Sequence, residues 1–300
     1  MATKKLNILL IHFNRPELLK SQLSSLEKIQ DYNFHVFLSI DGPRNQNNDD
    51  LKARSEFIKI LNNEGNLNIK LNLINENLGC KKGVESALDW FFKIVDKGIV
   101  FEDDIQITHE SLNFFNYWLA KTDEYVISAF SIPETSKPWL SKHGSVWGWA
   151  CNGKIWKSYR ENLDKKFKFK ALRSFESFKE FFVLLTWFFQ SNLKRIDTWD
   201  FDWNLYRRAN NIYTVMPPKS LVTNIGFSSK GTHTKTDIPY WMPSIMNISD
   251  LDIENKNIKF SKTLEKEYFF HKYSKVPYRF VLSELIKSFL FRIMERLKII

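Results

Sequence analysis

Short apolar runs alternate with longer segments of helical period through the first third of the chain. Residues 6–13 and 34–40 carry few polar positions, which is typical of strands buried on both faces of a parallel sheet. Residues 51–61 and 79–95 place apolar side chains at three- and four-residue intervals, as one face of a helix requires. Strands that alternate with helices predict an α/β fold, a mostly parallel sheet flanked by helices. Two more strands are expected at residues 68–74 and 99–101.

The first helix has its own start signal directly after the first strand. Asn14 is placed to cap this helix, Pro16 suits its first turn, and Glu17 would complete a capping box. We therefore expect the helix to begin at the carboxyl end of the strand, where open α/β sheets bind ligands.

The second half of the chain is less regular, and residues 224–248 are rich in Gly, Ser, Thr and Pro, as in a loop. We expect three parts, namely residues 1–130, residues 131–240 and a C-terminal extension over residues 241–300. The elements predicted beyond residue 120 are a strand at 125–130, an apolar stretch at 145–150, helices at 154–162, 174–190 and 199–209, two short strands within 211–223, and a helix at 278–300.

Three consecutive acids, Glu102, Asp103 and Asp104, follow the fourth predicted strand. Carboxylates at the end of a buried strand are costly unless positive charge lies beside them, and the neighbouring sequence supplies none. A hard divalent cation that also binds phosphates fits this position. The alternative is a solvated acidic turn after an edge strand.

A second acidic pair, Asp200 and Asp202, lies between Trp199 and Trp203. Apolar neighbours desolvate a carboxylate and raise its basicity, which a general base needs. Asp202 is the preferred base, since Asp200 is also placed to cap the helix that starts near Phe201.

Further candidates lie near the same predicted edge. Asp41 ends the second strand and could accept hydrogen bonds from a base or a ribose, or simply form an Asp-Gly-Pro turn. Arg15 stands at a helix N-terminus, which favours phosphate, or it is a solvent-exposed arginine. Trp147 and Trp149 flank Gly148, which could let a sugar approach the backbone, although two tryptophans in a strand are more often part of the core.

Composition narrows the class of protein. The chain carries a net charge of +10, which favours anionic partners, but its basic residues are scattered and no nucleic-acid-binding motif occurs. No apolar run approaches the roughly 20 residues that span a bilayer. The two cysteines, Cys80 and Cys151, fit a reducing compartment and form no zinc motif. We expect a cytoplasmic protein, soluble or peripheral on the inner face of a membrane, that does not bind nucleic acid.

The order of these pieces resembles a GT-A glycosyltransferase, and more narrowly the N-acetylglucosaminyltransferase I family, glycosyltransferase family 13. The likeness runs collinearly over about residues 6–235. One departure is Phe201, which separates two acids that are adjacent in the family. The matching stretches are residues 9–18 with Asn14-Arg15, residues 38–42 with Asp41, residues 99–107 with Glu102-Asp-Asp104, Gly148-Trp149, Trp199 to Trp203, and residues 217–231.

This resemblance implies a nucleotide-sugar-binding half over residues 1–130 and a half for the acceptor and the base over residues 131–240. Asp104 would ligate Mn²⁺ or Mg²⁺ on the diphosphate of a UDP-sugar, and His233 would complete the metal site unless it is merely an exposed loop histidine. The remaining donor contacts would come from Asn14, Arg15, Asp41, Glu102, Asp103 and Trp149.

The expected activity is inverting transfer of a hexosyl or N-acetylhexosaminyl group to a saccharide or lipid-linked saccharide, in synthesis of a bacterial surface polysaccharide or lipopolysaccharide. One rival is a nucleotidyltransferase, but the segment from His12 to Pro16 lacks the glycines of a phosphate loop. A second rival is a basic nucleic-acid-binding protein, which the charge alone favours.

The C-terminal helix places Leu282, Ile286, Phe289 and Ile293 on one face. Lysine and arginine lie opposite or on the flanks of this face, with Glu284 and Glu295 among them. Such a helix is typical of binding at an anionic membrane surface. The alternative is a terminal helix that docks on the domain.

Overall fold

The computed structural model describes residues 4–163, 166–192, 197–227, 252–273 and 278–296. Its main feature is an eight-stranded sheet of order β3-β2-β1-β4-β8-β6-β9-β7. These strands are β1 (Lys4–His12), β2 (Tyr32–Ile40), β3 (Asn68–Leu73), β4 (Lys97–Glu102), β6 (Val126–Ser128), β7 (Trp139–Ser141), β8 (Trp149–Asn152) and β9 (Thr214–Met216).

Four of the seven strand pairings in this sheet are parallel, and they include every pairing among β3, β2, β1 and β4. The predicted α/β class with a mostly parallel sheet is therefore confirmed. Beyond β4 the sheet becomes mixed, because β8 runs antiparallel to both β4 and β6. A separate antiparallel pair joins β5 (Ile105–Gln106) to β10 (Thr223–Asn224).

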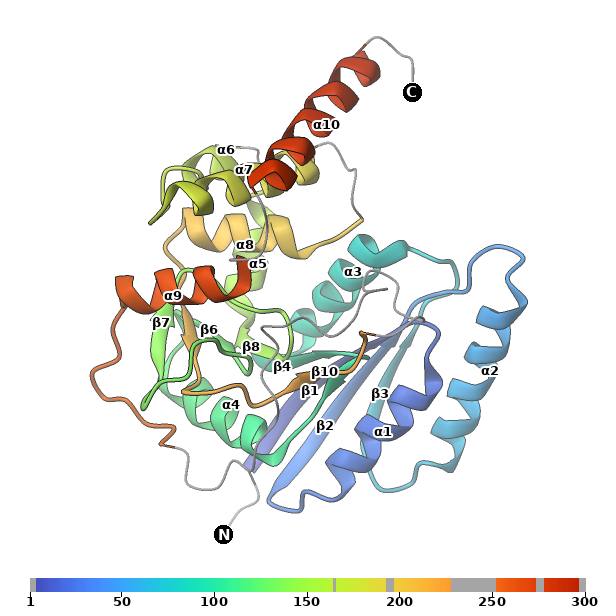
Figure 1. The fold of residues 1–300 in the computed structure, drawn as a ribbon. Helices are drawn as coiled ribbons and strands as arrows, with labels where there is room; N and C mark the ends of the chain where they lie inside the picture. Colours follow the sequence, from blue (N-terminus) through green and yellow to red (C-terminus); the bar gives the residue numbers. More distant parts are fainter. Residues whose placement is uncertain (1–3, 164–165, 193–196, 228–251, 274–277, 297–300) are drawn as a thin grey trace.

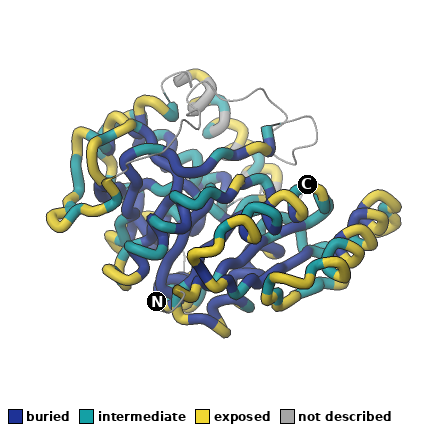
Figure 2. The backbone as a smooth tube through the Cα atoms, turned by 90° about the horizontal axis from the view of Figure 1, so that it is seen from below, coloured by how far each residue is buried: buried dark blue, intermediate teal, exposed yellow. Residues whose placement is uncertain are grey.

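Helices cover both faces of the sheet (Figure 1). Ile8 and Leu10 of β1 pack with α1, α2 and α4 on one face, whereas Leu9 packs with α3, α5 and α8 on the other. Buried backbone accordingly fills the middle of the molecule in Figure 2. The helices are α1 (Pro16–Glu27), α2 (Asn48–Asn63), α3 (Gly79–Ile94), α4 (His109–Lys121), α5 (Gly153–Glu161), α6 (Lys166–Ala171), α7 (Phe178–Asn192), α8 (Asp200–Ala209), α9 (Lys262–Tyr273) and α10 (Tyr278–Arg296).

The start of α1 corrects one expectation. Pro16 is the first helical residue as predicted, but the N-cap position belongs to Arg15, which makes no side-chain cap. The side chain of Asn14 instead donates to Asp50 Oδ1 at 3.1 Å. The predicted capping box is wrong, because the Asn14 amide ties the end of β1 to the first turn of α2.

The sheet continues across the expected boundary at residue 130. Strand β6, from the first part, lies between β8 and β9 from the second. The strand predicted at 125–130 and the strand expected before Pro217 are present as β6 and β9, whereas the apolar stretch at 145–150 is extended only from Trp149. The two parts therefore share one sheet.

Helix α10 confirms the predicted C-terminal helix over residues 278–296 and extends away from the body of the molecule (Figure 1). In the described part of the chain, no helix combines the length and apolarity needed to cross a bilayer.

Candidate active site

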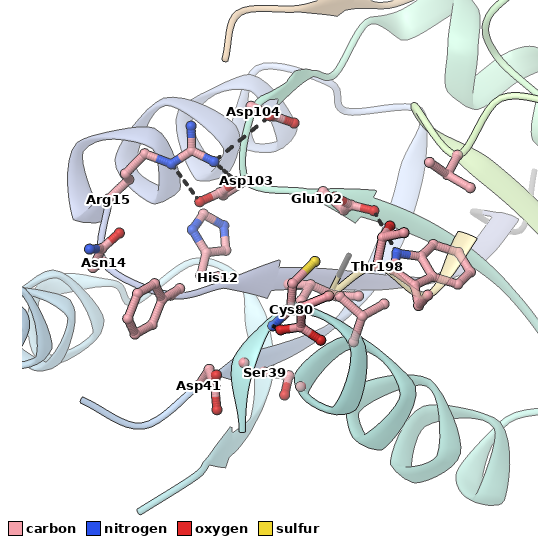
Figure 3. A pocket seen from close by; sticks show the side chains of 18 of the residues that line it. His12, Asn14, Arg15, Ser39, Asp41, Cys80, Glu102, Asp103, Asp104 and Thr198 are labelled. Atoms are coloured by element: carbon pink, nitrogen blue, oxygen red, sulfur yellow. Dashed lines mark hydrogen bonds and ion pairs between the residues drawn. The ribbon is translucent and has the colours of Figure 1, made fainter. Parts of the chain in front are cut away.

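A cavity of about 420 Å³ opens where β1, β2 and β4 end. Parallel strands bring their carboxyl ends to one edge, so residues distant in sequence converge there (Figure 3). Helices α3 and α8 close other sides with their N-terminal residues. Of the predicted site residues, those that line this cavity are Asn14, Arg15, Asp41, Glu102, Asp103, Asp104 and Asp200.

The acidic triplet is partly neutralised by Arg15. Its Nε donates to Asp103 Oδ2 at 2.9 Å, its other nitrogen pairs with Asp103 Oδ1, and Asp104 Oδ2 lies 3.8 Å away. The positive charge that the local sequence lacked therefore comes from the turn after β1, the strand that pairs with β4. Arg15 is where the sequence placed it, but its guanidinium is engaged by Asp103.

Burial shapes the charge of all three acids. It raises the pKa of Glu102 well above its ordinary value, assisted by Asp104 and Asp103. Burial and the neighbouring Asp103 raise the pKa of Asp104 to about 6. Burial also raises the pKa of Asp103, although Arg15 acts in the opposite direction. The guanidinium of Arg15 alone therefore does not neutralise the negative charge of the three acids.

A loop fixes the position of Asp104. Its carbonyl accepts from the N–H of Ile225 at 2.8 Å, which ties the turn after β4 to the segment after β10. A Cβ on Gly226 would lie 2.3 Å from Asp104 Oδ2, so glycine is needed beside this carboxylate.

The charged residues of the lining are mostly acidic. The lining contains six carboxylates and two arginines, and Arg44 is already paired with Asp50 at 2.7 Å. Carboxylate oxygens with unbalanced negative charge are the ligands that Mg²⁺ and Mn²⁺ prefer. The residues around Asp104 therefore fit a divalent cation.

Asp41 faces the cavity from the end of β2. Its carboxylate accepts from the N–H of Leu78 at 3.0 Å and from Asn77 Nδ2 at 3.1 Å, and burial raises its pKa. A Cβ on Gly83 would lie 3.2 Å from Asp41 Oδ2. Asn77, Gly79 and Gly83 also line the cavity and were missed by sequence reasoning. The sequence feature that could have indicated them is Asn77-Leu78-Gly79, which starts the helix that follows a strand.

Asp202 lies away from this cavity, which reverses the preference for it over Asp200. Lys81 Nζ is 2.5 Å and Lys168 Nζ 2.6 Å from its oxygens, and Ser191 donates to it as well. Burial would raise the pKa of Asp202, but these hydrogen bonds hold it below its ordinary value. Asp202 is therefore a buried anchor between helices.

Asp200 is the acid of this pair that lines the cavity. It is the first residue of α8, whose N-cap is Trp199, so the capping alternative does not hold. Thr198 donates to one carboxylate oxygen, and burial raises the pKa of Asp200. A partly buried carboxylate with a raised pKa is suited to accept a proton.

Trp149 is buried in this structure, and the expectation that it contacts the donor is wrong. Its ring is 1% exposed and packs against Trp199 and Trp203, with centroids 5.8 and 5.7 Å away. Trp147 lines the cavity instead. Gly148, at φ +66°, provides the left-handed backbone between the two tryptophans. Trp199 Nε1 in turn donates to Glu102 at 3.3 Å.

His233 lies outside the described residues, so its role as a metal ligand stays a prediction.

His12 lines the cavity and was not singled out from the sequence. Burial lowers its pKa to about 4, and its Nε2 donates to Gln22 at 2.9 Å. Gln22 then donates to the carbonyls of Glu102 and Ile105, both at 2.9 Å, which braces the acidic turn.

A second polar cluster, His143, Glu180 and Glu265, is buried apart from the cavity, with ligand atoms within 4.8 Å of one another. His143 Nε2 donates to Glu180 at 2.9 Å, and Ser141 donates to Glu265 at 2.6 Å. Arg208 pairs with Glu180 and lies 3.7 Å from Glu265. Because Arg208 already supplies the positive charge, we assign this cluster a structural role.

No protein-family model matches the chain, and no curated protein matches it significantly. Solved structures give distant similarities. The mannosyltransferase PcManGT from Pyrobaculum calidifontis, in complex with GDP-Man and Mn²⁺, has 12% identity and a TM-score of 0.38 over 51% of this chain and 46% of that one. TarS from S. aureus, in complex with UDP, has 14% identity and a TM-score of 0.43 over 73% of this chain and 59% of that one.

The glycosyltransferase GlyE from Streptococcus pneumoniae TIGR4 has 14% identity and a TM-score of 0.35 over 52% of this chain and 36% of that one. The chain thus spans less than two thirds of each of these three neighbours. Similarity of this degree carries no inference about activity, which must come from the residues of the cavity.

Proposed function

We propose that this chain is a divalent-metal-dependent, inverting glycosyltransferase that moves a sugar from a UDP-sugar to an acceptor hydroxyl. One observation carries the proposal: a cavity at the carboxyl ends of parallel strands holds six carboxylates but only two arginines, each already paired with an aspartate. That charge suits a cation with a bound diphosphate. The same cavity contains a separate, partly buried acid, Asp200, which is suited to a proton transfer.

Asp104 is the proposed metal ligand, with Glu102 and Asp103 beside it. A bound Mn²⁺ or Mg²⁺ would neutralise the negative charge that a leaving diphosphate develops. Arg15 holds Asp103 in place and adds positive charge next to the same position. Asp41 and the N-terminal residues of α3 border the part of the cavity where a nucleobase is proposed to lie.

Asp200 is the proposed general base. Its carboxylate takes the proton of the acceptor hydroxyl while the acceptor oxygen forms its bond to the anomeric carbon. The bond from that carbon to the diphosphate oxygen breaks, and the nucleoside diphosphate leaves with the electron pair. A single displacement inverts the anomeric configuration and needs one base. A surface polysaccharide or lipopolysaccharide as the product stays a prediction.

Thermal unfolding with a panel of nucleotide sugars, with and without Mn²⁺, tests this function. We expect one UDP-sugar plus Mn²⁺ to stabilise the protein, by about 2.7 kcal/mol at a hundredfold excess over Kd. Asp104→Ala should abolish the Mn²⁺-dependent part, whereas Asp49→Ala, at an exposed position on α2, should not. Failure of every nucleotide sugar to shift the transition would contradict the proposal.

A further inference from the structure

Exposed apolar side chains gather at the end of the molecule built from α6, α7 and α10. Phe178, at the start of α7, is 76% exposed, and Phe169 of α6, Ile286 and Phe289 of α10 are 59–60% exposed. Four of the five most exposed large apolar residues in the described chain therefore lie here. Figure 1 shows the three helices together, away from β2 and β3. We call this surface the helical end.

Helix α10 leaves one apolar side uncovered by the described chain. Its exposed residues Leu282, Ile286, Phe289 and Ile293 recur at three- and four-residue intervals, so they share one side of the helix. The helix also packs on α7. Its 19 residues span about 28 Å, but it lacks the apolarity of a bilayer-crossing segment. The geometry therefore suits a helix that lies on an apolar boundary.

Among the side chains that the structure describes on α6, α7 and α10, the exposed charged ones are positive. Lys170 is exposed in the last turn of α6, Arg173 is exposed just after this helix, and Arg279 and Lys287 are exposed on α10. The nearby acids on the α7 side are engaged, because Glu176 pairs with Lys142 and Lys262 and Glu180 with Arg208. Apolar side chains ringed by lysine and arginine are complementary to anionic lipid headgroups over acyl chains.

We propose that the helical end binds the surface of an anionic lipid bilayer. Helices α6 and α7 pack on α8, and the first residue of α8, Asp200, lines the cavity. Attachment through these helices would hold the cavity close to the bilayer. The acceptor would then be a saccharide on a lipid anchor, a consequence that rests on the proposed glycosyltransferase function.

Vesicle flotation of the full chain tests the attachment without any donor, cation or acceptor. We expect the protein to float with vesicles of equal parts phosphatidylcholine and phosphatidylglycerol, and not with phosphatidylcholine alone. Phe178→Ser with Phe289→Ser should abolish flotation. The matched control is Leu51→Ser with Leu71→Ser, two exposed residues on α2 and β3, which should leave flotation unchanged.

Charge is tested separately by Lys170→Gln with Arg173→Gln. This pair should weaken binding to anionic vesicles roughly 30-fold, from about 1 kcal/mol per basic residue near such a surface, and added salt should weaken the wild type in the same way. Circular dichroism verifies that each variant is folded.

Two results would overturn the attachment. One is equal flotation of the wild type and the Phe178–Phe289 variant. The other is a wild-type dimer in sedimentation that this variant dissociates, which would make the helical end a contact between two copies. A protein that floats as expected but transfers no sugar would leave the attachment standing and contradict only the enzyme assignment.

Discussion

At the scale of single residues, two carboxylates that lie two positions apart on α8 have different surroundings and different roles. Asp200 and Asp202 are about 200° apart around the helix, since each residue turns it by about 100°. One therefore faces the cavity, and the other faces Lys81 and Lys168. The sequence contains both acids but does not show which way the helix is rotated.

We predict that Asp200→Asn lowers turnover by roughly 10²–10⁴-fold with little change in donor binding, because the amide keeps the shape and loses the basicity. Asp202→Asn should instead lower the free energy of unfolding by about 3 kcal/mol, because two lysines lose their buried counter-charge. Steady-state kinetics and urea unfolding of both variants measure these effects. A turnover loss confined to Asp202→Asn would reverse the two roles.

Gly226 supports a second prediction at this scale. A methyl group there would displace the Asp104 carboxylate, so Gly226→Ala should lower Mn²⁺-dependent nucleotide affinity by roughly 10–100-fold, as loss of metal-site support does elsewhere. Gly65→Ala is the control, since a Cβ at Gly65 would meet nothing within 4 Å. Isothermal titration with UDP and Mn²⁺ compares the two. Equal affinities would mean that Asp104 does not hold the cation.

At the scale of elements, the cluster of His143, Glu180, Glu265 and Arg208 joins the end of β7 to α7, α8 and α9. Burial would raise the pKa of Glu180, but its hydrogen bond from His143 and the neighbouring Arg208 lower it to about 2. The ionised carboxylate therefore stabilises the fold above pH 4.5, its ordinary pKa, and this contribution is lost as the pH falls through about 2.

We predict that Glu180→Gln lowers the free energy of unfolding at pH 7 by about 3 kcal/mol, the value of a pKa shift of this size. The variant should also lose less stability than the wild type between pH 4.5 and pH 2. Urea unfolding across this range measures both effects, with Glu56→Gln on exposed α2 as the control. Parallel pH profiles for the wild type and Glu180→Gln would refute the stabilising role of the carboxylate.

The elements also show what pattern alone can predict. The strands and helices of the parallel half were predicted, because burial on both faces of β1 and β2 leaves unbroken apolar runs. Helices α4, α6 and α9 were missed. Thr108 marks the start of α4, because its side chain and that of Ser111 form a capping box. The acidic triplet just before it, however, is also typical of a loop.

The residues of the candidate site also divide into those that the sequence predicted and those that it did not. Asp41 and the acids after β4 were placed together by topology, since parallel strands end at one edge. The burial of Trp149 and the engagement of Arg15 by Asp103 depend on side-chain packing between segments far apart in sequence, which periodicity does not encode.

At the scale of the whole molecule, one sheet crosses the two expected halves, with β6 paired on both sides to strands from beyond residue 148. We predict a single unfolding transition in urea. Far-UV circular dichroism reports the whole chain, whereas tryptophan fluorescence weights the buried Trp149, Trp156, Trp199 and Trp203. Coincident midpoints are expected. An earlier fluorescence transition would show that the second half unfolds independently.

The acidic lining has a kinetic consequence for a molecule that is basic overall. A net charge of +10 attracts a nucleotide diphosphate from solution, but the six carboxylates repel it at the mouth of the cavity. The same carboxylates attract a divalent cation. If the proposed function holds, productive encounters with the donor become frequent only after the cation has entered, so we expect the order of binding to depend on ionic strength.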